Sequence, residues 1–196
     1  MASDAPASPA PDAAPDAALV AEPRWLDADE KRVWIGWVFA TRLFWEETER
    51  DLAHDADMPF GYYDILVMLS EKPDKRLRMS DLADGTQSSR SRLSHAVNRL
   101  EALGWVRRES CPEDRRGQVA VLTDAGFAAL VAAAPRHVES VRAHLFDVLT
   151  PEQLAHLDDI TQTLLDHLLP LVAARGDGRT EHFARARQVH GVAPRE

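Results

Sequence analysis

Cysteine is almost absent from this chain, because Cys111 is the single one among 196 residues. One thiol cannot form an internal disulfide, and such a composition fits a reducing compartment. Long apolar runs are missing too: no stretch approaches the roughly 20 uninterrupted apolar residues that cross a bilayer. The N-terminus has neither the basic start nor the apolar run of a signal peptide. We therefore expect a soluble, cytoplasmic protein with no membrane partner.

Motifs of catalysis and of metal binding are also missing. Ser–His and Asp–His pairs are frequent in so polar a sequence, but none lies beside a nucleophile turn or a glycine-rich anion loop. The histidine pairs His137/His144 and His156/His167 lack Cys-x-x-Cys or His-Glu-x-x-His spacing. We expect no enzyme activity, no cofactor and no metal, with a zinc site left as an alternative.

Charge of one sign is concentrated in the middle of the chain. The formal net charge is -9, yet residues 72–118 carry 11 Lys and Arg against 7 Asp and Glu. The rest carries 12 against 25. This asymmetry indicates that the central segment meets a polyanion, although a local excess of this size also arises by chance.

The pattern of apolar and breaking residues predicts a mainly α-helical fold with a small β-wing. Residues 1–24, rich in Ala, Pro, Asp and Ser, are expected to form a disordered tail, and residues 175–196 a C-terminal tail. Between them we expect one domain over residues 25–174. Its parts are a winged helix-turn-helix over 60–122 and dimerisation helices over 26–54 and 123–172.

Apolar residues in the outer helices are too numerous for one packing face. The first helix carries Trp34, Phe39 and Trp45 beyond its main stripe. Helix 123–148 contains Pro135, which should bend it, and has an expected apolar face of Phe127, Leu130, Val131, Val138, Val141 and Leu145. Thr150-Pro151-Glu152-Gln153 then reads as a cap, an N1 proline and a capping box. The last helix repeats apolar residues at three- and four-residue steps, at Leu154, Leu157, Ile160, Leu164, Leu168 and Leu171.

Two short helices are expected in succession before residue 104. Ser80 should cap the first, and the second should run from Ser88 or Ser89 to about Leu103, with Gly104 as its stop. The inward side chains of the second are predicted to be Leu93, Ala96, Val97, Leu100 and Leu103. Its outward side chains are Arg90, Ser91, Arg92, Ser94, His95, Asn98 and Arg99. No carboxylate appears there before Glu101, which favours a groove-facing helix over a merely solvated one.

A β-hairpin is expected after Gly104. Trp105-Val106 and residues 119–122 have strand composition, and residues 76–78 predict an edge strand. The turn is expected to contain Cys111, Pro112, Glu113, Asp114 and Gly117, and the hairpin carries Arg107, Arg108, Arg115 and Arg116. Thr123 should cap the following helix. A narrow cationic hairpin tip can enter the minor groove of DNA, and the helix that ends before Gly104 can enter the major groove.

The order of elements and the motif DRRGQVAVLTDAG, residues 114–126, resemble the MarR family of winged-helix transcriptional regulators. The family pattern is Asp, any residue, Arg, a small residue, then a strand ending in Leu-Thr and a Gly three residues later. The resemblance covers about residues 26–172, and the turn Gly85-Thr86-Gln87 is more polar than the family pattern. It implies that Asp114 braces an arginine and that Arg116 enters the minor groove. It also implies a homodimer on a pseudo-palindromic promoter site in double-stranded DNA.

Taken together, the sequence predicts a sequence-specific DNA-binding regulator. Repression is the mode we adopt, although the residues do not distinguish it from activation. The predicted DNA contacts are Arg78, Ser89, Arg90, Ser91, Arg92, His95, Asn98, Arg99, Asp114, Arg115 and Arg116.

A small aromatic or anionic effector is a further expectation, since such regulators commonly bind one beside the first helix. The candidate residues are Trp37, Arg42, Trp45, Tyr62 and Tyr63, for which ordinary core and interface packing is the alternative. The residues also leave open a redox-responsive regulator using Cys111, a metal-responsive regulator, and a helical interaction protein that binds no DNA. DNA affinity that falls with salt would separate the regulator from the interaction protein.

Overall fold

A computed structural model describes residues 23–111 and 114–174, with side chains for all of these except 114–116. Most of the predicted N-terminal tail, all of the predicted C-terminal tail, and Pro112 and Glu113 lie outside the described residues. The chain divides into two units, residues 1–39 and 40–196, and the boundary falls inside the first helix.

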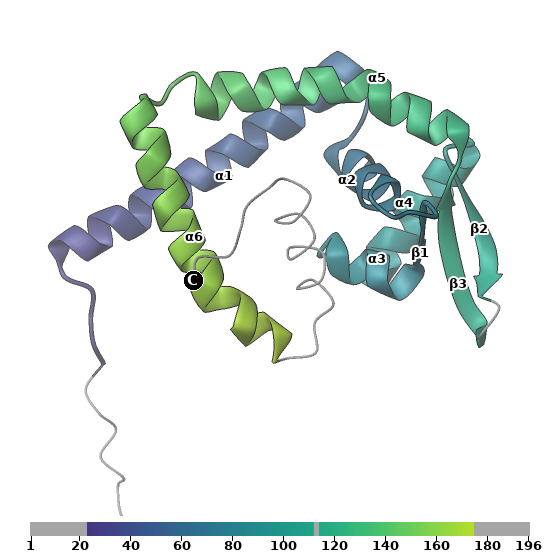
Figure 1. The fold of residues 1–196 in the computed structure, drawn as a ribbon, viewed down its shortest axis with the longest axis horizontal. Helices are drawn as coiled ribbons and strands as arrows, with labels where there is room; N and C mark the ends of the chain where they lie inside the picture. Colours follow the sequence, from purple (N-terminus) through teal and green to yellow (C-terminus); the bar gives the residue numbers. More distant parts are fainter. Residues whose placement is uncertain (1–22, 112–113, 175–196) are drawn as a thin grey trace, which may run out of the picture. The chain divides into compact units, whose positions relative to one another are not determined.

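The described elements are mostly helices with a small antiparallel sheet, as predicted (Figure 1). In chain order they are α1 (Ala28–Ala56), α2 (Phe60–Ser70), β1 (Arg76–Arg78), α3 (Met79–Gly85), α4 (Arg90–Ala102), β2 (Val106–Cys111), β3 (Asp114–Leu122), α5 (Asp124–Val141), the π-helical turn η1 (Arg142–Phe146) and α6 (Pro151–Ala173).

The described part of the first unit is residues 23–39, which include the start of α1. The Asp27 carboxylate caps the helix by accepting from the backbone N–H groups of Asp29 and Glu30, both at 2.8 Å. Large apolar side chains are exposed here, namely Trp25, Leu26, Val33, Trp34, Ile35, Trp37, Val38 and Phe39. The predicted excess of apolar surface on this helix is therefore present.

The core of the second unit is formed where the end of α1, the short helices and the sheet meet. Its buried side chains include Leu52, Leu66, Leu69, Leu82, Leu93, Val97, Leu100, Val106, Leu122 and Leu130. Leu103, predicted to face inward, is exposed instead. The helix has already ended at Ala102, so Leu103 no longer follows the helical stripe that buries Leu93, Val97 and Leu100.

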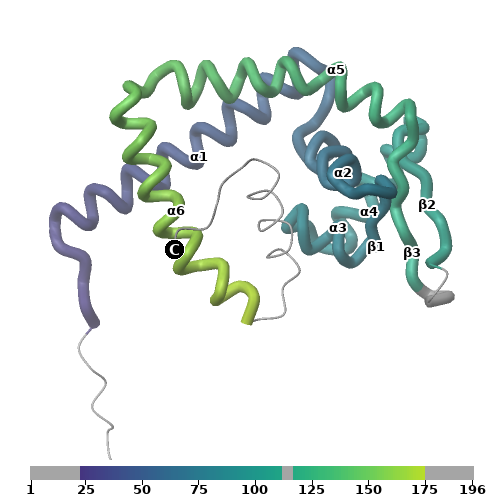
Figure 2. Tube along the Cα trace, in the orientation of Figure 1, coloured from purple at the N-terminus to yellow at the C-terminus, as the bar shows by residue number. Residues whose placement is uncertain are grey.

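The sheet has the strand order β1-β3-β2, and β1 is the edge strand that the sequence predicted. In β1, Arg76 lies opposite Val121 of β3, and in β2, Val106 lies opposite Leu122. Figure 2 shows β2 and β3 running side by side as a hairpin between α4 and α5.

The hairpin strands are longer than predicted and its turn is shorter. Cys111 closes β2, while Asp114 and Gly117 belong to β3, so neither end of the predicted turn is part of the reversal. Cys111 packs with Val119 and Val121 in a small buried cluster on the sheet. The polar residues between Cys111 and Val119 resemble a turn in the sequence. Exposed strand positions of a hairpin also tolerate polar residues, so the sequence alone does not separate the two.

The boundaries of the two short helices, α3 and α4, agree with the sequence prediction except at the N-cap of α3. Ser80 does not cap α3: its hydroxyl donates to the Asp81 carboxylate at 3.0 Å, and the N-cap position is Arg78. The edge strand β1 leads directly into α3, which leaves no separate capping residue. The stop at Gly104 is confirmed by its φ of 72°, a left-handed conformation that favours glycine.

The predictions for α5 and α6 are confirmed in part. The predicted single helix 123–148 ends at Val141, past Pro135, and continues as the π-turn η1. The buried residues of α5 are Gly126, Leu130, Ala133 and Ser140, whereas the predicted Phe127, Val131 and Val138 are exposed. The capping box at the start of α6 is present as predicted, and no residue of α6 is buried.

The junction between the sheet and α5 is closely packed. Thr123 caps α5 by accepting from the Gly126 N–H at 3.0 Å, and its own N–H donates to the Trp105 carbonyl at 3.0 Å. A Cβ on Gly126 would lie 2.1 Å from that carbonyl oxygen. The glycine of the Leu-Thr-x-x-Gly pattern is thus required by a backbone contact rather than by a turn.

Within residues 23–111 and 114–174, no helix combines the length and the apolar character needed to span a membrane.

Candidate nucleic-acid interface

The exposed face of α4 carries most of the predicted DNA contacts. Arg90, Ser91, Arg92, His95, Asn98 and Arg99 are all exposed. Ser89 is the N-cap of this helix, and its hydroxyl accepts from the Arg92 N–H at 3.2 Å. The first turn of α4 contains no acidic residue. The helix therefore presents hydrogen-bond donors and positive charge on an exposed face, as contact with a phosphate backbone requires.

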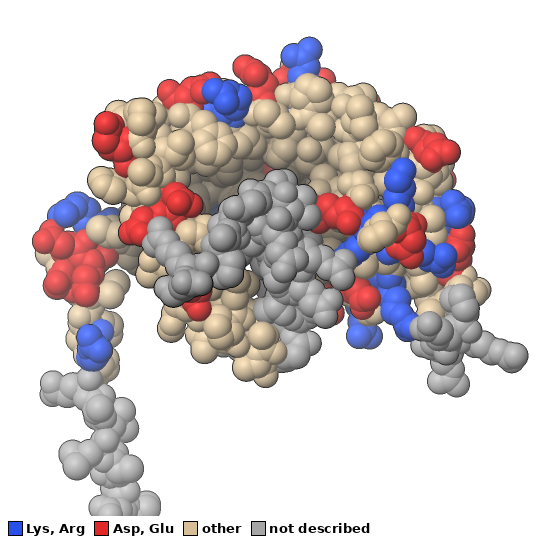
Figure 3. All heavy atoms as spheres, viewed as in Figure 1, with Lys and Arg blue, Asp and Glu red and all other residues tan. Residues whose placement is uncertain are grey.

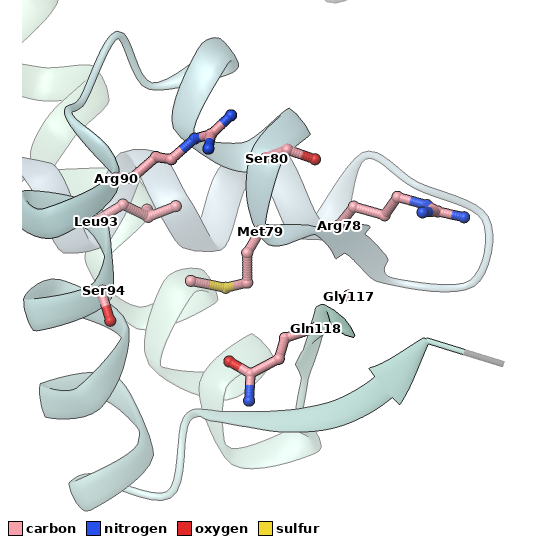
Figure 4. A pocket seen from close by; sticks show the side chains of 8 residues that line it. All are labelled: Arg78, Met79, Ser80, Arg90, Leu93, Ser94, Gly117 and Gln118. Carbon is pink, nitrogen blue, oxygen red and sulfur yellow. The ribbon is translucent and has the colours of Figure 1, made fainter. Parts of the chain in front are cut away.

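A groove of about 400 Å³ separates the start of α4 from the sheet (Figure 4). Arg78 and Arg90 line it from β1 and α4, and Gly117 and Gln118 line it from β3. The figure shows Met79 pointing into the space between α4 and β3, with the Gln118 side chain reaching toward it. The predicted contacts Arg78 and Arg90 are thus brought to one groove, although they lie 12 positions apart in the sequence.

Charge on the face shown in Figure 3 is uneven. Several Lys and Arg side chains gather over the region of α3, α4 and the sheet, with carboxylates among them. Carboxylates and arginines also pair on the sheet: Glu109 pairs with Arg76 at 3.0 Å and with Arg107 at 2.7 Å. Arg107 is therefore not a free cation of the hairpin.

Arg108, another of the four predicted arginines of the hairpin, contacts α4. Its side chain is only 16% exposed and pairs with Glu101 of α4. The same guanidinium donates to the Asn98 side-chain oxygen at 2.6 Å and to the Ser94 carbonyl at 3.1 Å. Sequence reasoning missed this contact, because no local pattern reports a bond between a strand and the preceding helix.

The start of β3, beside the hairpin tip, is described only by its backbone. Asp114 to Arg116 belong to β3, and their side chains are not among those described. The bracing role of Asp114 and the minor-groove roles of Arg115 and Arg116 therefore stay predictions.

The predicted effector residues are not gathered in one site of the second unit. Trp37 belongs to the first unit, and Arg42 is exposed. The Trp45 ring contacts Phe60, with ring centroids 5.6 Å apart. Tyr62 is half-buried, and Tyr63 is buried in the core. Tyr63 is therefore a packing residue, whereas Trp45 is exposed. The effector assignment stays a prediction.

His137 of α5 lies against this aromatic group. Its ring centroid is 4.7 Å from that of Tyr63 and 6.1 Å from that of Phe60. Its Nδ1 is buried without a hydrogen-bond partner among the described residues. Burial lowers the pKa of His137 below its ordinary value of 6.5, because desolvation penalises the imidazolium.

This shift predicts a pH-dependent stability. In the unfolded chain His137 takes up a proton as the pH falls through about 6.5, whereas the folded protein binds that proton only at lower pH. The unfolded state then binds more protons, so His137 lowers the free energy of unfolding as the pH falls below about 6.5. Urea unfolding of wild type and His137→Phe between about pH 5 and 8 should show a smaller loss on acidification in the variant. Equal slopes in the two proteins would contradict the assignment.

One group of possible metal ligands occurs among the described residues, namely Glu47, Asp51 and His144. Asp51 already accepts from the Ser140 hydroxyl at 2.9 Å and lies 2.8 Å from His144 Nε2. The bonds to His144 and Ser140 lower the pKa of Asp51. Glu47 pairs with Arg50. The bonds of Asp51 to Ser140 and His144 therefore link α1 to the end of α5 and to η1, which explains the cluster without a metal ion. The sequence did not predict that His144 would meet Asp51.

Cys111, the predicted alternative redox residue, is 5% exposed and packed on the sheet. Reactive thiols lie in accessible, electropositive surroundings. Cys111 packs on Val119 and Val121 and also lines a cleft with Arg76, Arg78, Asp74 and Asp81. Its burial gives no support to a sensing role.

The three-stranded sheet, the two short helices and the hairpin define a winged helix-turn-helix protein. A sequence model of the MarR family matches residues 56–117, which include α3, α4, β2 and the start of β3. Together with the solved structures below, this match shows that the chain belongs to the MarR family.

Two solved structures from Streptomyces coelicolor are similar over most of their length. Sco3205, a MarR family transcriptional regulator in complex with DNA, is 51% identical, with a TM-score of 0.68 over 75% of this chain and 92% of its own. AbsC, of the same family, is 43% identical, with a TM-score of 0.66 over 74% of this chain and 98% of its own.

Curated relatives match over a shorter part. The regulator PecS of Dickeya dadantii is 32% identical over 111 residues, or 55% of this chain. This chain spans 64% of the length of PecS and 66% of that of PrsX from Escherichia coli, less than two thirds in each case. The relatives named here are described as transcriptional regulators and not as enzymes.

Proposed function

We propose that this chain is a sequence-specific DNA-binding transcriptional regulator. The observation that carries the proposal is the exposed face of α4, where arginines, His95 and amide or hydroxyl side chains occur without a carboxylate before Glu101. A helix of this composition can bind in the major groove, where arginine pairs with guanine and with phosphates. The DNA complex of Sco3205, 51% identical, supports the same role here.

The proposed binding unit is a homodimer on a pseudo-palindromic site. One winged helix contacts too few bases to select a promoter, and two copies related by a two-fold axis contact two half-sites about one helical turn apart. The many exposed large apolar side chains of α1 and α6 support this assembly, since monomers rarely expose large apolar patches. Bound across a promoter, the dimer would repress transcription by occlusion.

Release by a small aromatic or anionic effector is the proposed control. Such a molecule acts only if its affinity differs between two spacings of the recognition helices. Trp45 and Tyr62 are the half-buried or exposed aromatic candidates of the second unit. Titration of the tryptophan fluorescence with aromatic carboxylates tests it, and a saturable change is expected.

The DNA-binding proposal is tested with purified full-length protein and random double-stranded DNA. Selection of bound fragments should yield two inverted half-sites, and the affinity should fall steeply as salt rises, because phosphate contacts release counterions. Failure to bind any duplex at low salt would overturn the proposal.

Arg116→Ala tests the assigned wing contact on the selected site. We expect roughly tenfold weaker binding and a smaller salt slope, by about one. Arg142→Ala is the matched control, since it removes the same charge from η1, where Arg142 pairs with Asp147 at 2.9 Å. Arg142→Ala should bind like wild type; full affinity in Arg116→Ala would remove the wing role.

A further inference from the structure

Arg108 joins strand β2 of the hairpin to helix α4, the helix proposed to bind in the major groove, through several hydrogen bonds. From β2 its guanidinium donates to three groups of α4, namely the Asn98 side chain, the Glu101 carboxylate and the Ser94 carbonyl. Its backbone N–H donates to the second Glu101 oxygen at 2.9 Å. With a side chain 16% exposed, Arg108 is held against α4 and not extended toward a ligand.

This contact determines which end of the Asn98 amide faces outward. A guanidinium has only N–H donors, so the atom 2.6 Å from Arg108 Nη1 must be the amide oxygen. The amide NH₂ group is then the part of the side chain left for another partner. Asn98 is exposed on α4 and follows Ser91 and His95 at steps of three and four residues, which places all three on one side of the helix.

We propose that Arg108 is a positioning residue that fixes Asn98 as a hydrogen-bond donor to DNA. The inference rests on the proposed DNA-binding function and specifies the chemistry of one contact. An asparagine that recognises adenine must accept from its amino group and donate to N7 at the same time. Here the oxygen is already bonded to a cation, which repels a second approaching N–H donor. The partner of Asn98 is therefore an acceptor, namely a base atom such as guanine O6 or N7, adenine N7 or thymine O4, or a phosphate oxygen.

Asn98→Ala and Asn98→Asp are the direct tests, using the full-length protein and the site selected by wild type. Alanine removes the donor, whereas aspartate keeps an oxygen for Arg108 and removes the donor as well. We expect Asn98→Ala to bind about tenfold more weakly with an unchanged thermal midpoint, and Asn98→Asp to bind more weakly still, because its carboxylate also repels the phosphates. Loss of the preference at one base pair on reselection would identify a base edge as the partner. Equal weakening on all sequences would identify a phosphate.

Two results would overturn the inference. One is wild-type affinity in Asn98→Ala. Another is an Asn98-dependent preference for adenine that is lost when purine, which lacks the amino group, replaces that adenine in the site. Both presuppose that wild type binds DNA, so they differ from the failure of the proposed function, in which wild type binds no duplex.

Arg108→Lys tests the positioning step. Lysine keeps the charge but cannot form the fork that reaches Asn98, Glu101 and the Ser94 carbonyl together. We expect a reduced preference at the base pair assigned to Asn98, and no further reduction when Arg108→Lys is added to Asn98→Ala. An additional loss of equal size in the double variant would show that Arg108 acts independently of Asn98. If Arg108→Lys does not fold, the two Asn98 variants still decide the proposal.

Discussion

Gly126→Ala is expected to lower the free energy of unfolding by about 3 kcal/mol or more, which is the upper range for forcing extra atoms into a packed site. The added Cβ would lie 2.1 Å from the Trp105 carbonyl oxygen and 2.8 Å from its carbon. Backbone atoms cannot rotate away as a side-chain end can. The strand-to-helix junction must therefore shift, and the Thr123 N–H bond to the same carbonyl would weaken.

Gly61→Ala is the matched control, because a Cβ at Gly61 in α2 meets no atom within 4 Å. Alanine favours the helix over glycine by about 1 kcal/mol, so this variant should be as stable as wild type or more so. Urea unfolding of the three proteins at one concentration is the measurement. Equal stability of Gly126→Ala and wild type would show that the close approach is not required.

Leu164→Asp combined with Leu168→Asp is expected to abolish dimer formation and to reduce operator affinity by about 100-fold or more. The two leucines lie four residues apart on α6, at 41% and 48% exposure in the single chain. In the proposed dimer they are covered by the second copy, where two carboxylates would be desolvated without partners. Separate subunits lose the gain of about 10²–10⁴ that linkage of two half-site contacts provides.

Ala155→Asp is the control for charge and helix propensity on the same element. At about 100° per residue, Ala155 falls on the side of α6 opposite Ile160 and Leu164. Sedimentation at micromolar concentration should give about 22 kDa for the double variant and twice that mass for the control and wild type. A dimeric double variant, or a wild type that sediments as one chain, would contradict the proposed assembly.

Sequence reasoning succeeded where one element carries its own signal. The capping box of Thr150 and Gln153, the stop at Gly104 and the cap at Thr123 depend on residues within one turn of each other. The edge strand Arg76–Arg78 was predicted for a similar reason, since Lys72 to Lys75 forms a turn before it.

The rest depended on contacts between distant elements. Arg108 bonds to Ser94 across 14 positions, and Asp51 meets His144 across 93 positions. Neither pair leaves a periodic pattern in the sequence. For the hairpin, the polar residues between Cys111 and Val119 resembled a turn, but cross-strand pairing with β2 extends β3 back to Asp114.

The final helix has a consequence for the lifetime of the regulator. None of the residues of α6 is buried within its own chain, so packing inside the monomer contributes little to holding this helix together. In the proposed assembly its order is supplied by the second copy, and the fraction of ordered chains rises with total concentration. Freshly synthesised or diluted subunits would expose this segment to proteases, whereas paired ones would not. Degradation would then be fastest when the protein is scarce, which sharpens the threshold at which a promoter becomes occupied.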